Sequence, residues 1–188
     1  CNTPEETPNC VIETYDTEKK VLLAWKDIIQ KENPDIIIGY NIFGFDYEFM
    51  FIRALETNCA YDFLQLSRNN DKVCGNLDTN PMTGGQSIEN SSIVIASGQH
   101  DLHYIKMDGR LQIDLYNYFR RDFNLTSYKL DYVSGYFIGD SVKTINHNGN
   151  TTIVESKNLA GLELGSYIHF EESSHSVDYY KDGAKFKL

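Results

Sequence analysis

The segment GYNIFGFD, residues 39–46, carries one carboxylate, that of Asp46, shortly after three consecutive isoleucines. The run Ile36 to Ile38 predicts a β-strand, and open α/β sheets bind ligands just beyond the carboxyl ends of their strands. Asp46 is therefore a candidate site residue, and a carboxylate in such a place suits a hard metal ion. A structural alternative stays open, because Asp is also a common N-cap and a helix is predicted from Tyr47.

The neighbours of Asp46 have a structural alternative too. The amide of Asn41 can donate and accept hydrogen bonds to a ligand, but Asn is equally typical of tight loops. Tyr40, Phe43 and Phe45 can stack on a flat ligand, although aromatic residues are more often part of a core. The segment thus predicts a site around Asp46 without proving one.

Composition narrows the function classes. The chain has 188 residues, 41% of them hydrophobic, and a formal net charge of −10. This acidity argues against DNA-backbone binding as the main activity of the segment, and it fits a metal site or a solubilising surface equally well. Four cysteines show no paired spacing typical of zinc sites, so reduced intracellular thiols are expected: Cys1, Cys10, Cys59 and Cys74.

Two predicted helices and a predicted strand are expected to position the Asp46 segment. A helix is predicted from an N-cap at Asp16 or Thr17 to the Asn33-Pro34 pair, since the residue before proline avoids the α region. Residues 35–39 follow as a strand, expected to be buried on both faces because its isoleucines do not alternate with polar residues. A helix over 47–57 comes next, with Phe49, Met50, Ile52 and Leu55 as its apolar positions.

The rest of the chain changes character twice. Residues 58–97 are rich in Asn, Ser, Gly and Asp and predict a long surface insertion. A strand over 110–115 and helices over 116–122 and 128–137 follow, the second helix with Ser127 as its N-cap. From Val142 the sequence predicts strands, with turns at Asn148-Gly149 and Asp182-Gly183.

Two long blocks carry a family resemblance. PDIIIGYNIFGFD resembles the second exonuclease motif of family B DNA polymerases, in which an Asn is followed by three intervening residues and then by Phe-Asp. GRLQIDLYNYFRRDFNLTSYKLDYVSGYFIG resembles the segment that follows this motif in delta-type polymerases. The residues of the motif GYNIFGFD, the long insertion and the β-rich tail most resemble those of polymerases from large double-stranded DNA viruses. The expected fold class is α/β, a partial RNase H-like exonuclease fold with a long polar insertion and a small β-rich tail module.

The resemblance implies a chemistry and a set of site residues. It implies proofreading 3′ to 5′ hydrolysis of mismatched ends by two divalent ions, Mg²⁺ or Mn²⁺, with Asp46 as one ligand. Asn41 would contact the 3′-terminal nucleotide, Phe45 would pack beneath the site, and Tyr40 and Phe43 would stack on bases. Asp114, at a strand end, is expected to be structural. Three arginines have two possible roles: Arg110, Arg120 and Arg121. Each could contact a DNA phosphate or pair with an acidic side chain of the protein, and pairing is favoured because the chain is acidic.

The resemblance also implies partners and a domain plan. The partners are DNA, as a single-stranded 3′ end and as primer-template, deoxynucleoside triphosphates in the parent enzyme, and a possible processivity factor. No membrane contact is expected, and the location is intracellular, in the host cytoplasm or nucleus. The expected plan is exonuclease domain over 1–57 and 109–141, an insertion, mostly loop, over 58–108, and a β-rich module over 142–188.

The other metal-ligand motifs of the family are not recognised in the chain, so we expect a fragment that is inactive alone. Two other classes stay open at this point. One is a stand-alone RNase H-like nuclease, which should carry its remaining carboxylates within the chain. The other is a non-enzymatic acidic interaction module, which would account for the charge and the polar insertion.

Overall fold

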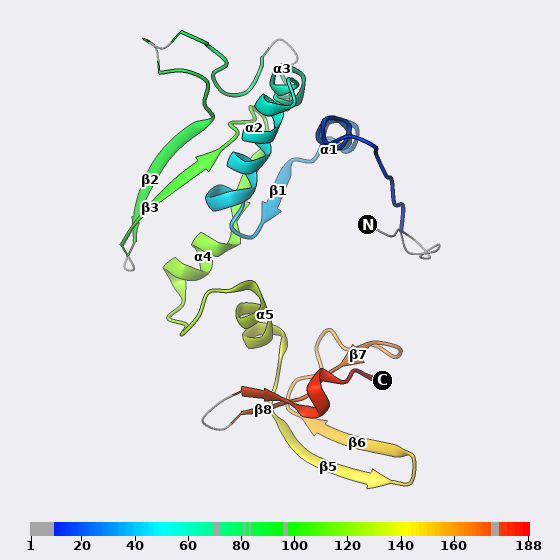
Figure 1. Cartoon of the computed structure of the whole chain (residues 1–188). Helices are drawn as coiled ribbons and strands as arrows, with labels where there is room; N and C mark the ends of the chain where they lie inside the picture. Colours follow the sequence, from blue (N-terminus) through cyan, green and yellow to red (C-terminus); the bar gives the residue numbers. More distant parts are fainter. Residues whose placement is uncertain (1–9, 70–71, 81, 83, 96–97, 174–176) are drawn as a thin grey trace. The chain divides into compact units, whose positions relative to one another are not determined.

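The computed structural model describes residues 10–69, 72–80, 82, 84–95, 98–173 and 177–188. The chain divides into two compact units, Cys1–Tyr128 and Lys129–Leu188. Within the described residues, no helix combines the length and the apolar character needed to cross a bilayer. The elements of the first unit are, in chain order, α1 (Glu18–Glu32), β1 (Ile36–Gly39), the π-helical turn η1 (Ile42–Asp46), α2 (Tyr47–Glu56), α3 (Ala60–Phe63), β2 (Glu89–Ile95), β3 (Gly98–Tyr104), β4 (Leu111–Asp114) and α4 (Leu115–Asp122) (Figure 1).

The ends of α1 follow from local signals in the sequence. Thr17 is the N-cap, and its hydroxyl accepts a hydrogen bond from the Lys20 amide at 3.4 Å. At the other end Asn33 adopts the left-handed conformation (φ 46°, ψ 52°), and its amide donates to the Ile29 carbonyl. The left-handed residue directly before Pro34 ends the helix as predicted, because proline disfavours the right-handed α conformation there.

A parallel pair of strands lies next to the candidate site. β1 pairs with β4, with Ile36 opposite Leu111 and Gly39 opposite Asp114. The two strands are parallel, so both end at the same edge of the sheet. The turn after β1 and the first residues of α4 therefore leave the sheet next to one another. The mixed α/β fold class is confirmed.

The expectation that β1 is buried on both faces is wrong. Ile36 is 50% exposed and Ile38 is 58% exposed, whereas Ile37 packs against the core. Side chains alternate between the two faces of a strand, so three apolar residues in a row do not show that both faces are covered. Among the described residues, nothing buries the face that carries Ile36 and Ile38.

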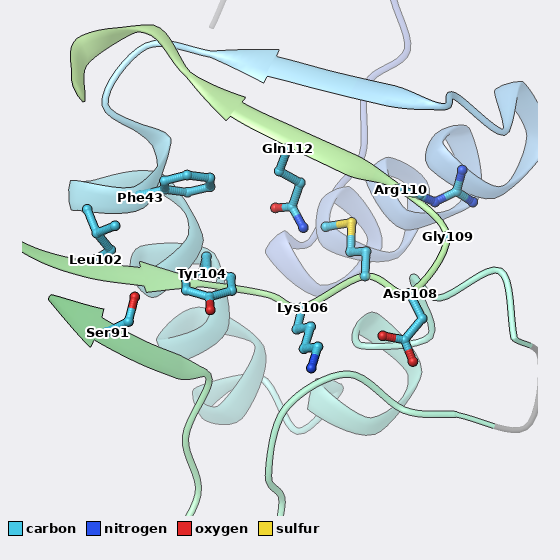
Figure 2. Close-up of a pocket in the computed structure, with 10 residues that line it drawn as sticks. Phe43, Ser91, Leu102, Tyr104, Lys106, Asp108, Gly109, Arg110 and Gln112 are labelled. Carbon is cyan, nitrogen blue, oxygen red and sulfur yellow. The ribbon is translucent and has the colours of Figure 1, made fainter. Parts of the chain in front are cut away.

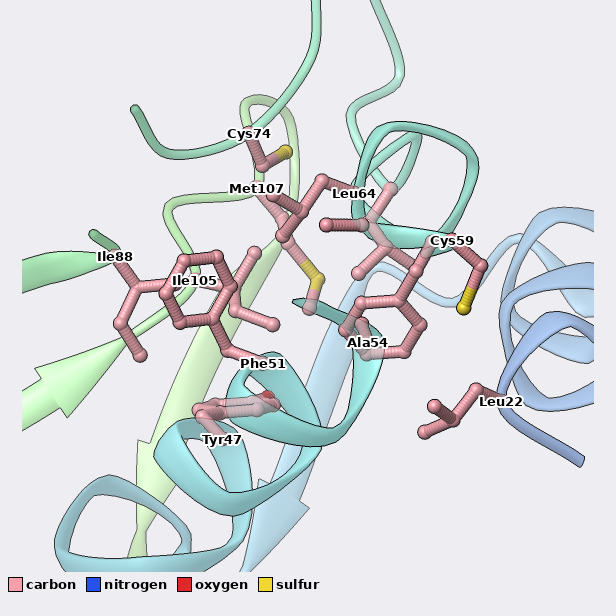
Figure 3. Close-up of a cluster of buried hydrophobic side chains, with 13 residues drawn as sticks. Leu22, Tyr47, Phe51, Ala54, Cys59, Leu64, Cys74, Ile88, Ile105 and Met107 are labelled. Atoms are coloured by element: carbon pink, nitrogen blue, oxygen red, sulfur yellow. The ribbon is translucent and has the colours of Figure 1, made fainter. Parts of the chain in front are cut away.

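The core draws much of its volume from the segment predicted to be mostly loop. Residues 58–108 contain α3 and an antiparallel hairpin of β2 and β3, with Glu89 opposite Tyr104. The core cluster joins side chains of α2 to side chains of this segment (Figure 3). The members from 58–108 are Cys59, Ala60, Phe63, Leu64, Leu66, Cys74, Ile88, Ile105 and Met107. The structure thus differs from the predicted surface insertion, because short apolar stretches between the polar runs pack inward.

The structure confirms two of the four predicted apolar positions of α2, because Met50 and Leu55 pack against the core. Its buried residues are Tyr47, Phe51 and Ala54, whereas Phe49 is 49% and Ile52 is 45% exposed. Both faces of this helix carry apolar residues, so helical spacing alone does not identify the buried one.

The second unit consists of α5 (Leu130–Ile138), β5 (Val142–Asn148), β6 (Thr151–Ser156), β7 (Tyr167–Ile168), β8 (Glu171–Ser173), β9 (Val177–Tyr179), the 3₁₀ turn η3 (Tyr180–Gly183) and β10 (Phe186–Lys187). β5 and β6 form an antiparallel hairpin with Asn148 opposite Thr151, and Gly149 has a positive φ of 60°. This confirms the turn predicted at Asn148-Gly149. The N-cap of α5 is Lys129 and not Ser127, and it makes no side-chain cap bond.

A single carboxylate closes the base of the β5–β6 hairpin. Asp140 accepts hydrogen bonds from the Ser141 amide at 2.7 Å, the Ser156 hydroxyl at 2.8 Å and the Asn158 amide at 2.6 Å. These donors, the Ser156 hydroxyl first, lower the pKa of Asp140 below its ordinary value of 3.8. Ionised Asp140 is therefore favoured by the folded hairpin.

We expect the hairpin to lose stability in acid through Asp140. Its pKa is lower when folded than when unfolded, so the stabilisation is complete above the ordinary value of 3.8 and is lost as the pH falls through the folded pKa. An NMR pH titration of the Ser141 and Asn158 amides should show both resonances moving together in this range. In Asp140→Asn, which cannot ionise, this step should be absent; if it persisted, another group would be responsible.

Candidate functional site

The candidate site lies in the turn between β1 and α2. β1 ends at Gly39, and Asn41 adopts the left-handed conformation with φ 62° and ψ 24°. The carbonyl of Asn41 accepts hydrogen bonds from the Gly44 and Phe45 amides, both at 3.1 Å. The π-helical turn Ile42–Asp46 then leads directly into α2. Short π-helical turns are frequent at functional sites, where they redirect a side chain.

Asn41 and Gly44 are packed against one another within this turn. A Cβ atom placed on Gly44 would lie 2.4 Å from Oδ1 of Asn41, so a side chain at 44 would force the Asn41 amide to turn away. The side chain of Asn41 makes no hydrogen bond to any residue that the structure describes. Its amide is thus held in place by packing while its donors and acceptor stay available to a ligand.

Asp114 holds the turn from the neighbouring strand. Its Oδ1 accepts from the Asn41 amide at 2.7 Å and from the Tyr116 amide at 3.0 Å. Its Oδ2 accepts from the Phe43 amide at 3.0 Å and from the Asn117 side-chain amide at 3.5 Å. Asp114 is 5% exposed, so both oxygens are engaged by the protein. The predicted structural role is confirmed: this carboxylate caps α4 and fixes the backbone of the Asn41 turn.

Asp46 has the opposite environment. It is exposed, lies in the right-handed α conformation, and makes no side-chain cap bond to α2. No hydrogen bond or ion pair joins its carboxylate to another described residue. Asp46 thus stands at the N-cap position of α2 without making a side-chain capping bond, and its carboxylate oxygens are available to bind a cation.

Burial and two carboxylates near the turn raise the pKa of the Tyr47 hydroxyl. Tyr47 is 2% exposed, and its hydroxyl has no hydrogen-bond partner among the described residues. Burial first, then the carboxylates of Asp114 and Asp46, raise the pKa of Tyr47 far above its usual value. Tyr47 thus stays neutral, and two negative charges near one buried ring give the turn a local potential that favours cations.

The structure brings Tyr40 and Phe43 into contact with protein groups. The Tyr40 hydroxyl donates to the Tyr128 carbonyl at 2.5 Å, and its ring centroid lies 5.7 Å from that of Tyr116. Phe43 packs between Tyr47, at 6.1 Å, and Tyr104, at 5.6 Å. Both rings are half-buried. Their stacking on DNA bases stays a prediction.

Phe45 does not pack beneath the site as the family pattern implied. It is 59% exposed, and its ring stacks on that of Phe49 with centroids 5.5 Å apart and planes 13° apart. Phe45 lies within the π-helical turn Ile42–Asp46 and is not a member of the core cluster. Asp114 fixes the backbone of the turn before Asp46, through the Asn41 and Phe43 amides.

A cavity of about 510 Å³ lies on the other side of Phe43, open to solvent (Figure 2). It is bounded by β3, β4 and the connection between them, with Tyr104, Lys106 and Gln112 among its lining residues. Neither Asn41 nor Asp46 lines it. The candidate site is thus an exposed turn rather than an enclosed pocket.

Parallel strands that end beside a turn with an exposed carboxylate are typical of ligand-binding α/β domains. Comparison with protein families makes the assignment specific. The chain belongs to DNA polymerase family B, exonuclease domain, whose family model matches residues 1–133.

The relatives are viral and eukaryotic polymerases. The DNA polymerase of Phaeocystis pouchetii virus is 46% identical over 196 residues, which cover 100% of this chain and 19% of that protein. The DNA polymerase of Pyramimonas orientalis virus is 36% identical over 89% of the chain and 13% of its own length. The DNA polymerase delta catalytic subunit of Oryza sativa subsp. japonica is 35% identical, over 72% of the chain and 11% of its length. The chain thus spans less than a fifth of the length of these relatives.

Exonuclease domains of this family are generally metal-dependent. Asp46 fits such a site as one ligand, because its oxygens are exposed and unpaired among the described residues. Asp114 does not fit, because its oxygens already accept protein hydrogen bonds. Across the residues that the structure describes, no three His, Cys, Asp or Glu side chains come together to hold a metal ion.

Proposed function

We propose that this chain is the exonuclease segment of a family B DNA polymerase and that Asp46 is a metal ligand of its 3′ to 5′ proofreading site. One observation carries the proposal: in a segment that matches the family's exonuclease domain, Asp46 is exposed and unpaired while Asp114 fixes the turn beside it. The fold proposed with this function is part of an RNase H-like domain.

The residues of the turn have distinct roles in this proposal. Asp46 binds a divalent ion, Mg²⁺ or Mn²⁺, and Asn41 offers its free amide to the 3′-terminal nucleotide. Asp114 positions both through the backbone. When bound, two divalent ions would stabilise the attacking and leaving oxygens of phosphodiester hydrolysis. Three phenylalanines lie in or next to the turn: Phe43, Phe45 and Phe49. Phe45 is the most exposed of them, and we propose that its ring contacts an unpaired base.

The function implies partners. We propose a single-stranded 3′ end as the substrate of this segment, with primer-template and deoxynucleoside triphosphates bound elsewhere in the polymerase. We also propose that the polymerase binds a processivity factor. We further propose that it acts where viral DNA is replicated, in the cytoplasm or the nucleus.

The test is degradation of a mismatched primer. A complete polymerase that carries this chain should shorten a 5′-labelled primer with a mismatched 3′ end when Mg²⁺ is present, and chelation of the metal should stop the reaction. The isolated chain should not shorten the primer, since a single free carboxylate cannot hold two ions. Absence of shortening by the complete polymerase would refute the proposal, and shortening by the isolated chain would favour a stand-alone nuclease.

A further inference from the structure

α4 combines aromatic and basic side chains on an otherwise acidic chain. Its sequence, LYNYFRRD, carries three aromatic residues and two arginines within eight residues. The helix begins at Asp114, the same carboxylate that fixes the Asn41 turn, so its position is tied to that of the candidate site. Interleaved aromatic and cationic side chains are how proteins hold single-stranded nucleic acid.

Two of the three arginines considered in the sequence are neutralised or fully engaged by the protein. Arg121 forms two hydrogen bonds to the carboxylate of Asp122, at 2.7 and 2.8 Å. Arg110 donates to the carbonyls of Leu66, at 3.1 Å, and Pro34, at 2.8 Å, and to the Asn33 side chain at 2.9 Å. Arg121 thus already has a counter-charge, and Arg110 already donates to three protein oxygens.

Arg120 is different. Its guanidinium lies over the rings of Tyr116, at 5.2 Å, and Tyr128, at 5.7 Å. Its Nη1 contacts the Tyr116 hydroxyl at 3.1 Å and Nδ1 of His100 at 3.3 Å. Within the described part of the chain, Arg120 makes no ion pair and its Nε has no hydrogen-bond partner. A half-buried cation is thus held by two aromatic rings, a hydroxyl and an imidazole nitrogen, and no carboxylate of the described residues pairs with it.

We propose that Arg120 binds a backbone phosphate of single-stranded DNA on its way to the Asp46 turn. The two rings hold the guanidinium plane by cation–π contact, which pre-orients the group for a phosphate. A phosphate supplies the missing counter-charge. The inference rests on the proposed function for its ligand, because that function brings a single strand to this face.

Binding of a fluorescein-labelled oligothymidylate tests the assignment, measured by anisotropy in EDTA over a series of KCl concentrations. Arg120→Gln should weaken binding by the chain about tenfold at low salt, since a charge-assisted hydrogen bond is lost. It should also reduce the slope of log affinity against log salt by about 0.7, the value for one phosphate contact on a single strand. Arg121→Gln is the matched control: it removes the same charge from the next residue, already paired with Asp122, and should change neither quantity.

Arg120→Lys separates phosphate binding from a merely structural role. Lysine keeps the charge and should retain the salt slope, even if melting shows that loss of the ring contacts lowers stability. Equal losses in the Gln variants of Arg120 and Arg121, an unchanged slope in Arg120→Gln, or no binding by the unmodified chain would overturn the proposal. Thymidine monophosphate should compete only far above oligonucleotide concentrations; equal competition would assign the site to free nucleotides. EDTA excludes catalysis, so a failed primer assay leaves this result intact, and the reverse also holds.

Discussion

Replacing Asp46 with Asn in a polymerase that carries this chain should lower 3′ to 5′ exonuclease activity by about a hundredfold or more. A metal ligand contributes charge stabilisation that is greatest in the transition state and is worth several kcal/mol. Asn keeps the size and the capping capacity of Asp but is a poorer ligand for Mg²⁺. The rate of removal of a mismatched 3′ nucleotide, measured at saturating Mg²⁺, reports the effect.

Two controls accompany this measurement. Nucleotide incorporation should stay close to the unmodified rate, because the polymerase reaction uses other residues. The melting temperature should also stay unchanged in Asp46→Asn and Asp46→Ala, since the carboxylate makes no bond to any described residue. If the Asn variant removed mismatched ends at the unmodified rate, Asp46 would not be a metal ligand and the site assignment would fail.

Replacing Asp114 with Ala should destabilise the first unit by about 3 kcal/mol or more. The substitution removes the acceptor for the Asn41, Phe43 and Tyr116 amides, and hydrogen bonds to a charged group contribute about 1.5–3 kcal/mol each. It also removes the N-cap of α4, worth about 0.5–2 kcal/mol. These values are large against a typical unfolding free energy of about 5–15 kcal/mol. Urea unfolding of the chain, followed by tryptophan fluorescence from Trp25, measures the change.

Asp46→Ala is the matched comparison, because it removes the same side chain from a position where it makes no bond. Asp114→Asn should fall between the two: it keeps one acceptor oxygen but turns an NH₂ group toward one set of amide donors. Equal stability of the Asp114→Ala and Asp46→Ala variants would show that the turn does not depend on Asp114.

Local signals were sufficient to predict several elements. Thr17, the Asn33-Pro34 pair and Asn148-Gly149 each determine their own backbone geometry within a few residues, and the structure agrees at all three. The Asp46 turn was also located from sequence, because a carboxylate directly after a strand is a recognisable pattern.

Other features depend on contacts between distant residues and were not predictable in this way. The β2–β3 hairpin pairs Glu89 with Tyr104, and its strands carry polar residues that do not alternate clearly with apolar ones. Asp114 lies 73 residues from Asn41, so its part in the turn becomes visible only when β1 and β4 are adjacent. A signal for its capping role did exist, since Asp directly precedes the predicted helix.

The contact between Asn41 and Gly44 makes these two positions interdependent in evolution. A side chain at 44 would collide with the Asn41 amide at 2.4 Å, so it is tolerated only where residue 41 has already become smaller or has turned away. A side chain at 44 alone would displace the Asn41 amide, whereas a smaller residue at 41 would leave room for it. Homologous turns should therefore fall into two groups, with Gly at 44 wherever the Asn amide takes this orientation, and mixed combinations should be rare.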